Sequence, residues 1–127
     1  MKGMNVMKKV YCLYRGSNKE IKEQKRACCA YVKLLGWTVS KEFCEDGNIY
    51  YDKMDSLMLI RDEVLKQKVD ILLVYDFNNI SNDEMEIPFA ASWFVDNGIH
   101  VVSVKNKKRD FKKERGEILN KFGIYIN

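Results

Sequence analysis

The feature that most constrains how this chain folds is a short apolar segment, VDILLVY, at residues 69–75. Almost every residue in it is apolar, which is typical of a central strand covered on both faces. Further strand and helix patterns alternate along the chain. Strands are expected at residues 8–14, 37–43, 99–104 and, as a short final strand, 123–126, and helices at 21–35, 56–68, 83–97 and 111–122. This alternation predicts a single α/β domain, with a mostly parallel sheet of four or five strands and helices on both faces.

Several residues predict where these elements end. Gly36 stands where the first helix should terminate, and Ser56 stands where it would cap the second helix. Pro88 is tolerated only near the first turn of a helix, so the third helix is expected to be kinked or to start late. The polar segments at residues 45–55 and 76–82 are expected to be loops.

The composition excludes several classes of protein. With 127 residues and 46% hydrophobic content, the chain has enough apolar surface for one core and too much for a disordered protein. No apolar run reaches the roughly 18 residues that a membrane helix needs, and the N-terminus lacks the apolar stretch of a secretory signal. We therefore expect a cytoplasmic protein without membrane contacts, in which residues 1–127 form one domain and residues 1–7 are disordered.

The cysteines and the single histidine limit the chemistry of the chain. The four cysteines follow no C-x-x-C spacing, so they are expected to be reduced thiols, with Cys28 and Cys29 buried in the first helix. One histidine excludes most His-dependent metal and triad chemistry, and no metal-ligand spacing is present. We expect neither a metal nor another cofactor.

Positive charge is concentrated near the C-terminal end. The formal net charge is +4, and residues 105–121 contain eight basic and three acidic residues. Such a basic stripe favours an anionic partner, most commonly nucleic acid, although a solvated helix face is the alternative. The candidate phosphate contacts are Lys105, Lys107, Lys108, Arg109, Lys112 and Lys113.

The most informative loop follows the first predicted strand, at Tyr14-Arg15-Gly16-Ser17. In an open α/β sheet, ligands bind at the carboxyl ends of the strands. An arginine can bind phosphate oxygens in a bidentate manner while a nearby serine hydroxyl attacks phosphorus, so Arg15 and Ser17 are the candidate catalytic pair. The alternative is that Ser17 only caps the next helix and that Arg15 is solvated.

Other phosphate-handling sites are excluded by spacing. A Cys-based phosphatase loop starting at Cys12 would need an arginine where Asn18 stands, and the glycines of a P-loop are missing. Asp46 and Asp76 follow the second and third predicted strands, and we interpret them as loop-capping acids rather than as catalytic acids.

Several segments match one family pattern in order and spacing. They are Tyr14-Arg15-Gly16-Ser17, Gln24, Gly36-Trp37-Thr38-Val39, Glu45-Asp46-Gly47, Val69-Asp70-Ile71-Leu72-Leu73-Val74 and Asn97-Gly98-Ile99-His100-Val101. Together they resemble the N-terminal catalytic domain of the serine site-specific recombinases, the resolvase/invertase family. The resemblance covers residues 10–104. It implies a flavodoxin-like strand order, a DNA substrate, and a role in recombination or integration of the kind found in mobile elements.

The resemblance also implies a mechanism. Ser17 would attack a DNA phosphodiester, form a 5′-phosphoseryl linkage and release a 3′-OH without a metal, while guanidinium groups stabilise the charge on the phosphate. Dimers or tetramers on DNA are implied as well. The candidate supporting residues are Gln24, Asp46 and Arg61.

The chain departs from the family pattern at most of its active-site arginines. After the third strand the family has Asp-Arg-Leu-x-Arg, whereas residues 78–82 read NNISN here, and a further family arginine falls near residue 56. The degenerate positions are Asn78, Asn79, Asn82 and Ser56. Loss of one preorganised donor typically costs about 2.7–4 kcal/mol of transition-state stabilisation. We therefore expect weak or absent cleavage, which leaves open whether the chain is an enzyme.

Two other interpretations stay open. The chain could be an inactive relative that acts by DNA binding or oligomerisation, or a flavodoxin-like binding module unrelated to DNA. Family members continue into a long dimerisation helix and a separate DNA-binding domain, and we expect that domain to be absent from a chain that ends at Asn127.

Overall fold

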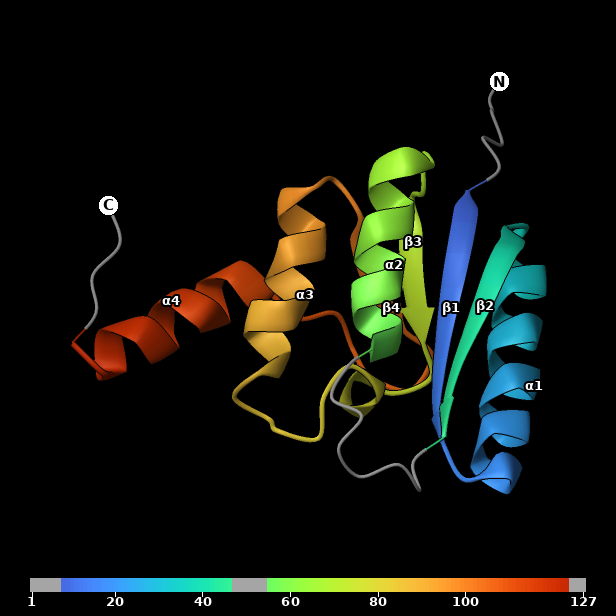
Figure 1. Cartoon of the computed structure of the whole chain (residues 1–127), viewed down its shortest axis with the longest axis horizontal. Helices are drawn as coiled ribbons and strands as arrows, with labels where there is room; N and C mark the ends of the chain where they lie inside the picture. Colours follow the sequence, from blue (N-terminus) through green and yellow to red (C-terminus); the bar gives the residue numbers. More distant parts are fainter. Residues whose placement is uncertain (1–7, 47–54, 124–127) are drawn as a thin grey trace.

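A computed structural model describes residues 8–46 and 55–123, which contain a four-stranded sheet (Figure 1). The strands are β1 (Lys9–Gly16), β2 (Thr38–Asp46), β3 (Ile71–Val74) and β4 (His100–Ser103). They lie in the order β2-β1-β3-β4, and each neighbouring pair is parallel. The predicted α/β domain with a parallel sheet and flavodoxin-like strand order is confirmed.

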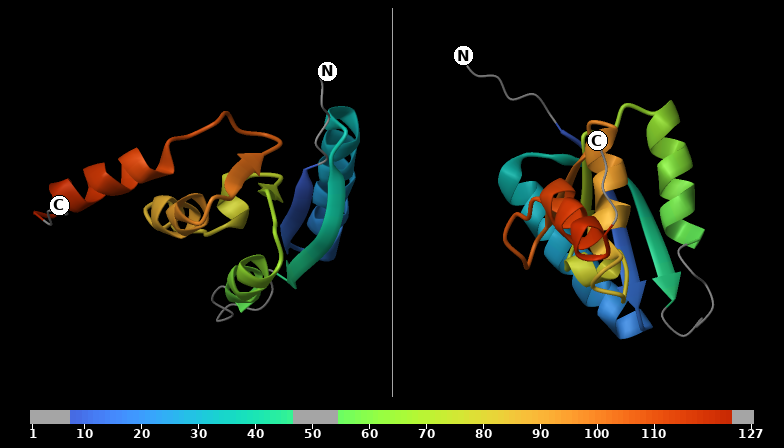
Figure 2. Two further views of the ribbon diagram at one scale, coloured as in Figure 1. Left: turned by 90° about the horizontal axis from the view of Figure 1, so that it is seen from above. Right: turned by 90° about the vertical axis from the view of Figure 1, so that its left-hand side faces the viewer.

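Helices cover both faces of this sheet (Figure 2). They are α1 (Asn18–Leu35), α2 (Asp55–Lys66), α3 (Ile87–Asp96) and α4 (Phe111–Lys121), and a short 3-10 turn, η1 (Phe77–Asn79), follows β3. α1 lies on one face, and α2 and α3 lie on the other. α4 packs against α3 and points away from the sheet.

The core follows from the alternation of side chains along β1, because successive residues of a strand point to opposite faces. Cys12 and Tyr14 are buried with Cys28 of α1, whereas Leu13 is buried on the other face with Ile60 of α2. All four residues of β3 are buried, which confirms the central strand predicted from its apolar sequence.

Most helix ends lie where local signals predict them. Gly36 adopts the left-handed conformation at the end of α1, with φ 72°. α3 starts late, at Ile87, with Pro88 in its first turn. The expected cap at Ser56 is wrong, because α2 already begins at Asp55 and Ser56 is its second residue.

β2 is longer than the sequence predicts. β2 extends through Asp46, so the loop expected from residue 45 starts later; the reason is that β2 pairs with β1 along its whole length. Residues 124–126 of the expected final strand, and residues 1–7, lie outside the described residues.

The cysteines differ in environment. Cys12 and Cys28 are buried, and this burial raises the pKa of both thiols to about 12. Cys29 is exposed, which corrects the expectation of burial: successive helical residues are about 100° apart, so Cys28 and Cys29 face different directions. None of the described cysteines forms a disulfide.

Within the described residues, no group of three His, Cys, Asp or Glu side chains could hold a metal ion. Among the described helices, none has the length and apolar character to cross a membrane.

α4 is attached to the rest of the domain by its first residue. Phe111 is buried and packs edge-on against Phe77, with 5.0 Å between ring centroids. Farther along the helix, Lys112 and Arg115 form ion pairs with Asp96 at the end of α3, at 3.2 and 3.3 Å. Since exposed ion pairs contribute little, the Phe111 ring is expected to supply most of the docking energy.

Phe111→Ala should therefore lower the free energy of unfolding by about 3 kcal/mol, through lost burial and a cavity beside Phe77. Urea unfolding followed by circular dichroism measures this change. The matched control is Phe122→Ala at the exposed C-terminal end of α4, which should cost less than about 0.5 kcal/mol. Equal losses for the two variants would show that Phe111 does not anchor the helix.

Candidate functional site

The carboxyl ends of β1 and β3 border an open cleft of about 460 Å³. The lining residues are Arg15, Gly16, Ser17, Glu20, Gln24, Tyr75, Asp76, Asn78, Asn79 and Asn82. They come from three elements that meet at one edge of the sheet: the end of β1, the start of α1 and the loop after β3. Arg15 and Ser17 thus lie in one cleft, at the strand ends where open parallel sheets bind ligands.

Ser17 is held at the N-cap of α1. Its Oγ accepts a hydrogen bond from the Glu20 N–H at 3.2 Å, and the Glu20 carboxylate accepts one from the Ser17 N–H at 2.8 Å. The hydrogen bond that the Ser17 N–H donates to the carboxylate lowers the pKa of Glu20. Gly16 precedes the cap with φ 141°, and a Cβ there would come within 2.8 Å of the Glu20 carboxylate, so the turn requires glycine. Ser17 is therefore both a helix cap and a residue of the cleft.

Arg15 is fixed through its backbone and its side chain. The Gln24 amide accepts a hydrogen bond from the Arg15 N–H at 2.9 Å and donates one to the Arg15 carbonyl at 2.8 Å. The guanidinium forms an ion pair with Glu45, and the side chain is only 13% exposed. Among the described residues no acceptor reaches the buried Arg15 Nε. Arg15 is thus held in place rather than solvated, and Gln24 supports it.

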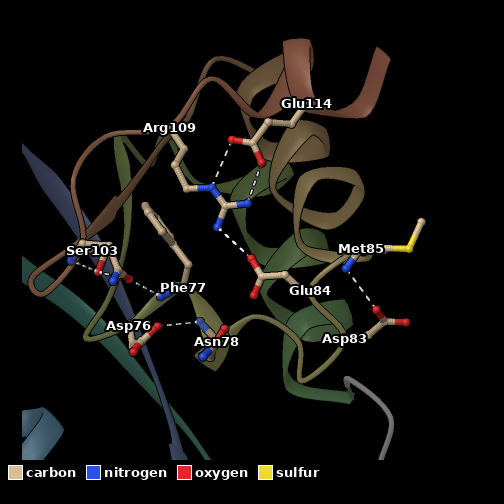
Figure 3. A network of polar contacts seen from close by, with 10 residues as sticks. Asp76, Phe77, Asn78, Asp83, Glu84, Met85, Ser103, Arg109 and Glu114 are labelled. Carbon is tan, nitrogen blue, oxygen red and sulfur yellow. Dashed lines mark hydrogen bonds and ion pairs between the residues drawn. The ribbon is translucent and has the colours of Figure 1, made fainter. Parts of the chain in front are cut away.

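The loop after β3 is a compact turn. Asp76 accepts a hydrogen bond from the Asn78 N–H at 2.9 Å (Figure 3). The Asn79 side chain accepts one from the Asp76 N–H at 3.0 Å. Asn79 is buried by this role, whereas Asn78 and Asn82 are exposed along the cleft. Asp76 caps the η1 turn, as its interpretation as a loop-capping acid predicts.

The charges around the cleft nearly cancel. Arg15 is the one cation among the lining residues, and its charge is matched by Glu45. Glu20 and Asp76 add two carboxylates to the lining, and Lys105 Nζ lies 3.5 Å from the Asp76 carboxylate. The cleft is therefore rich in amides and hydroxyls but has no surplus of positive charge.

Of the other two candidate supporting residues, Arg61 does not reach the cleft. Arg61 lies over the Trp93 ring, 4.4 Å from its centroid, on the outer surface of α2 and α3. It does not line the cleft and does not replace the missing arginines there. Ser56 lies in the first turn of α2 and Asp46 at the end of β2, and their side chains are outside the described part of the structure.

The basic segment near the C-terminus is partly used within the molecule. Arg109 donates hydrogen bonds to Glu114 and Glu84, and its guanidinium lies 5.6 Å from the centroid of the Phe77 ring (Figure 3). The hydrogen bonds to Glu114 raise the pKa of Arg109. Lys105 and Lys112 pair with aspartates. Among the six candidate phosphate contacts, those without an ion pair in the described structure are Lys107, Lys108 and Lys113.

Glu20 and Glu45 are the site residues that sequence reasoning missed. For Glu20 the signal is the spacing of a capping box, in which a glutamate follows the capping serine by three residues. For Glu45 the signal is the register, because Arg15 and Glu45 occupy paired positions on β1 and β2. Predicting the ion pair between Arg15 and Glu45 from the sequence would have required the register of β1 and β2, which depends on how far β2 extends.

The comparisons with known proteins agree with this architecture. The N-terminal catalytic domain of TP901-1 integrase shares 20% identity with this chain, with a TM-score of 0.75 over 91% of this chain and 96% of that one. A resolvase family site-specific recombinase from Streptococcus pneumoniae shares 16% identity, with a TM-score of 0.72 over 91% and 85%. The C-terminal catalytic domain of ISC1926 TnpA, an IS607-like serine recombinase, shares 15%, with 0.67 over 90% and 80%. At these identities the likeness shows a shared fold.

The sequence itself gives the family. No curated protein matches the chain at a significant level. Residues 12–124, however, match the family described as Resolvase, N terminal domain. Because that match spans nearly the whole 127-residue chain, the protein belongs to the resolvase N-terminal domain family of DNA recombination proteins.

Proposed function

We propose that this chain acts on DNA as a serine-recombinase domain in which strand cleavage is slow. Ser17 is the nucleophile and Arg15 is the cation that binds the scissile phosphate. The observation that carries the proposal is their position: both line one open cleft, and Arg15, the only cation among its described lining residues, is paired with Glu45.

The chemistry needs one bond to form and one to break. Ser17 Oγ attacks phosphorus, the bond to the 3′-oxygen breaks, the serine proton is lost and the 3′-oxygen gains a proton. Because Ser17 Oγ accepts its hydrogen bond from the Glu20 N–H, the hydroxyl proton is left available for removal. A neighbouring carboxylate is that of Glu20, which accepts a hydrogen bond from the Ser17 N–H and whose lowered pKa makes it a weak base.

The electrostatics of the cleft make this reaction slow. Negative charge develops on the phosphate oxygens in the transition state, and preorganised donors that match this charge supply much of the rate. Asn78 and Asn82 offer neutral amide groups, and the Asn79 side chain is occupied in the η1 turn. The cleft thus provides orientation and hydrogen bonds but little compensating charge.

Asn82→Arg is expected to raise the formation of a covalent Ser17–DNA adduct. Asn82 is exposed, lines the cleft and lies beyond η1, so an arginine there adds a cation while leaving the turn intact. One donor of this type is worth on the order of 10²-fold in rate. The measurement is the amount of Ser17-containing peptide carrying DNA, by mass spectrometry, after incubation with a random-sequence library of nicked duplexes.

Ser17→Ala is the control for this assay and should form no adduct. If the unmodified chain forms adduct as fast as Asn82→Arg, the claim of slow cleavage is wrong. If both remain folded and neither forms any adduct, Ser17 is not the nucleophile.

Glu45→Gln tests whether Glu45 neutralises Arg15. Loss of the counter-charge should lower the free energy of unfolding by about 1–3 kcal/mol, because the Arg15 side chain is largely buried. The freed guanidinium should then bind phosphate, so inorganic phosphate should raise the melting temperature of Glu45→Gln more than that of the unmodified chain. The control is Glu117→Gln, at an exposed position in α4 away from the cleft. An equal response to phosphate in all three proteins would contradict the assignment.

A further inference from the structure

The outward face of α1 carries a line of unpaired cations. α1 forms the outer layer over its face of the sheet and buries Gln24, Cys28 and Val32 (Figure 2). The opposite side of the helix presents four exposed basic residues, here called the α1 stripe: Lys19, Lys22, Arg26 and Lys33. At about 100° and 1.5 Å per residue, these four positions fall within a sector of roughly 60° and extend over about 21 Å.

The α1 stripe and the basic segment near the C-terminus both carry cations without an ion pair. On α1, Lys25 pairs with Glu42 on β2, but none of the four stripe residues forms an ion pair within the described structure. In the C-terminal segment, half of the eight cations are paired (Lys105, Arg109, Lys112 and Arg115), and half are not: Lys107, Lys108, Lys113 and Lys121. The four cations of the α1 stripe share one narrow sector of a single helix, whereas the unpaired cations of the C-terminal segment are divided between α4 and the loop before it.

The chemistry of the α1 stripe favours a polyanion. Only the four basic residues fall inside the sector; the exposed Cys29 and Ala30 each lie about 20° beyond one of its edges, and Glu23 lies about 40° beyond. Protein interfaces have cores depleted in lysine and enriched in aromatic residues, and membrane-binding helices present a large apolar face. The α1 stripe, in contrast, contains three lysines and no aromatic residue, and it has no large apolar face. Its length matches about six base pairs of duplex DNA, at 3.4 Å per base pair.

The α1 stripe also begins beside the candidate site. Lys19 follows Ser17 by two residues, and Ser17 lines the cleft as the cap of the same helix. We propose that the α1 stripe binds the phosphate backbone of duplex DNA next to the cleft, an inference that rests on DNA being the substrate of the proposed function. Affinity then comes from cations that lie outside the cleft, while the cleft itself contributes little charge.

The test compares two variants with equal charge loss. K19Q/K22Q/R26Q/K33Q removes the α1 stripe, and K107Q/K108Q/K113Q/K121Q removes four exposed cations of the C-terminal segment. Fluorescence anisotropy measures binding of a labelled 20-base-pair duplex between 50 and 200 mM KCl. Four phosphate contacts correspond to a salt slope of about −3.6, or roughly a 150-fold loss of affinity over this range. K19Q/K22Q/R26Q/K33Q should lose most of this salt slope, and K107Q/K108Q/K113Q/K121Q should lose less than half as much of it.

The outcomes separate this inference from the proposed function. If the unmodified chain forms no adduct but binds the duplex in a way that depends on the α1 stripe, the α1 inference stands whatever the chemistry of Ser17. An unchanged slope in K19Q/K22Q/R26Q/K33Q, or equal losses in the two fourfold variants, would overturn the inference. The inference would also be overturned if poly-L-glutamate bound as tightly as the duplex and K19Q/K22Q/R26Q/K33Q weakened both to the same extent. That result would indicate an acidic protein as the partner. Circular dichroism of each variant checks that the fold is retained.

Cys29 offers a second readout without changing the charge. It is exposed on α1 beside the stripe, about 20° beyond the edge of its sector, whereas Cys44 is exposed on β2. A duplex carrying a disulfide-activated tether on one phosphate should cross-link to Cys29, as the thiolate displaces the tether's leaving thiol. Cys29→Ser should abolish the cross-link, and Cys44→Ser should leave it. The reverse pattern would place the DNA away from α1.

Discussion

The pairing of β1 with a parallel neighbour on each edge determines where the rest of the site lies. β2 and β3 hold β1 in register, so that Leu13 lies opposite both Phe43 and Val74. Since all three strands run in the same direction, their carboxyl ends meet at one edge. The β1 turn, the start of α1 and the loop after β3 therefore surround a single cleft. Without this register, Arg15 and Ser17 would be two polar residues on a turn with nothing opposite them.

The ion pair between Arg15 and Glu45 connects this architecture to chemistry. It holds the guanidinium at the cleft but cancels the charge that a phosphate would need. Gln24 fixes the backbone of the same residue, so the arginine is well ordered and electrostatically weak. In the proposed function, this arrangement and the amides after β3 favour binding of DNA over its rapid cleavage. The α1 cations that form no ion pair in the described structure would, by the further inference, add affinity without taking part in the reaction.

Local sequence patterns were sufficient for much of the fold. The apolar run that became β3, and the glycine that ends α1, act over a few residues and are visible in the sequence. Ser17 and Arg15 could be named because a hydroxyl and a guanidinium at a strand end suggest phosphate chemistry. The burial predicted for Cys29 is wrong, because adjacent residues of a helix point in different directions and only Cys28 faces the core. Arg61 was kept as a candidate although its guanidinium lies over Trp93, about thirty residues later in the chain.

The succession of strands and helices along the chain, the family, and the departure from the family's arginines after β3 can all be read from the amino-acid sequence, because each depends on residue identity and short-range spacing. Which charges are neutralised, in contrast, depends on how the chain folds. Glu45 neutralises Arg15, and Glu84 and Glu114 engage Arg109, whereas the cations on the outer side of α1 have no such neighbours in the described structure. The physical reason is that Coulomb interactions act through space, and a charge count along the chain contains no distances between residues far apart in sequence.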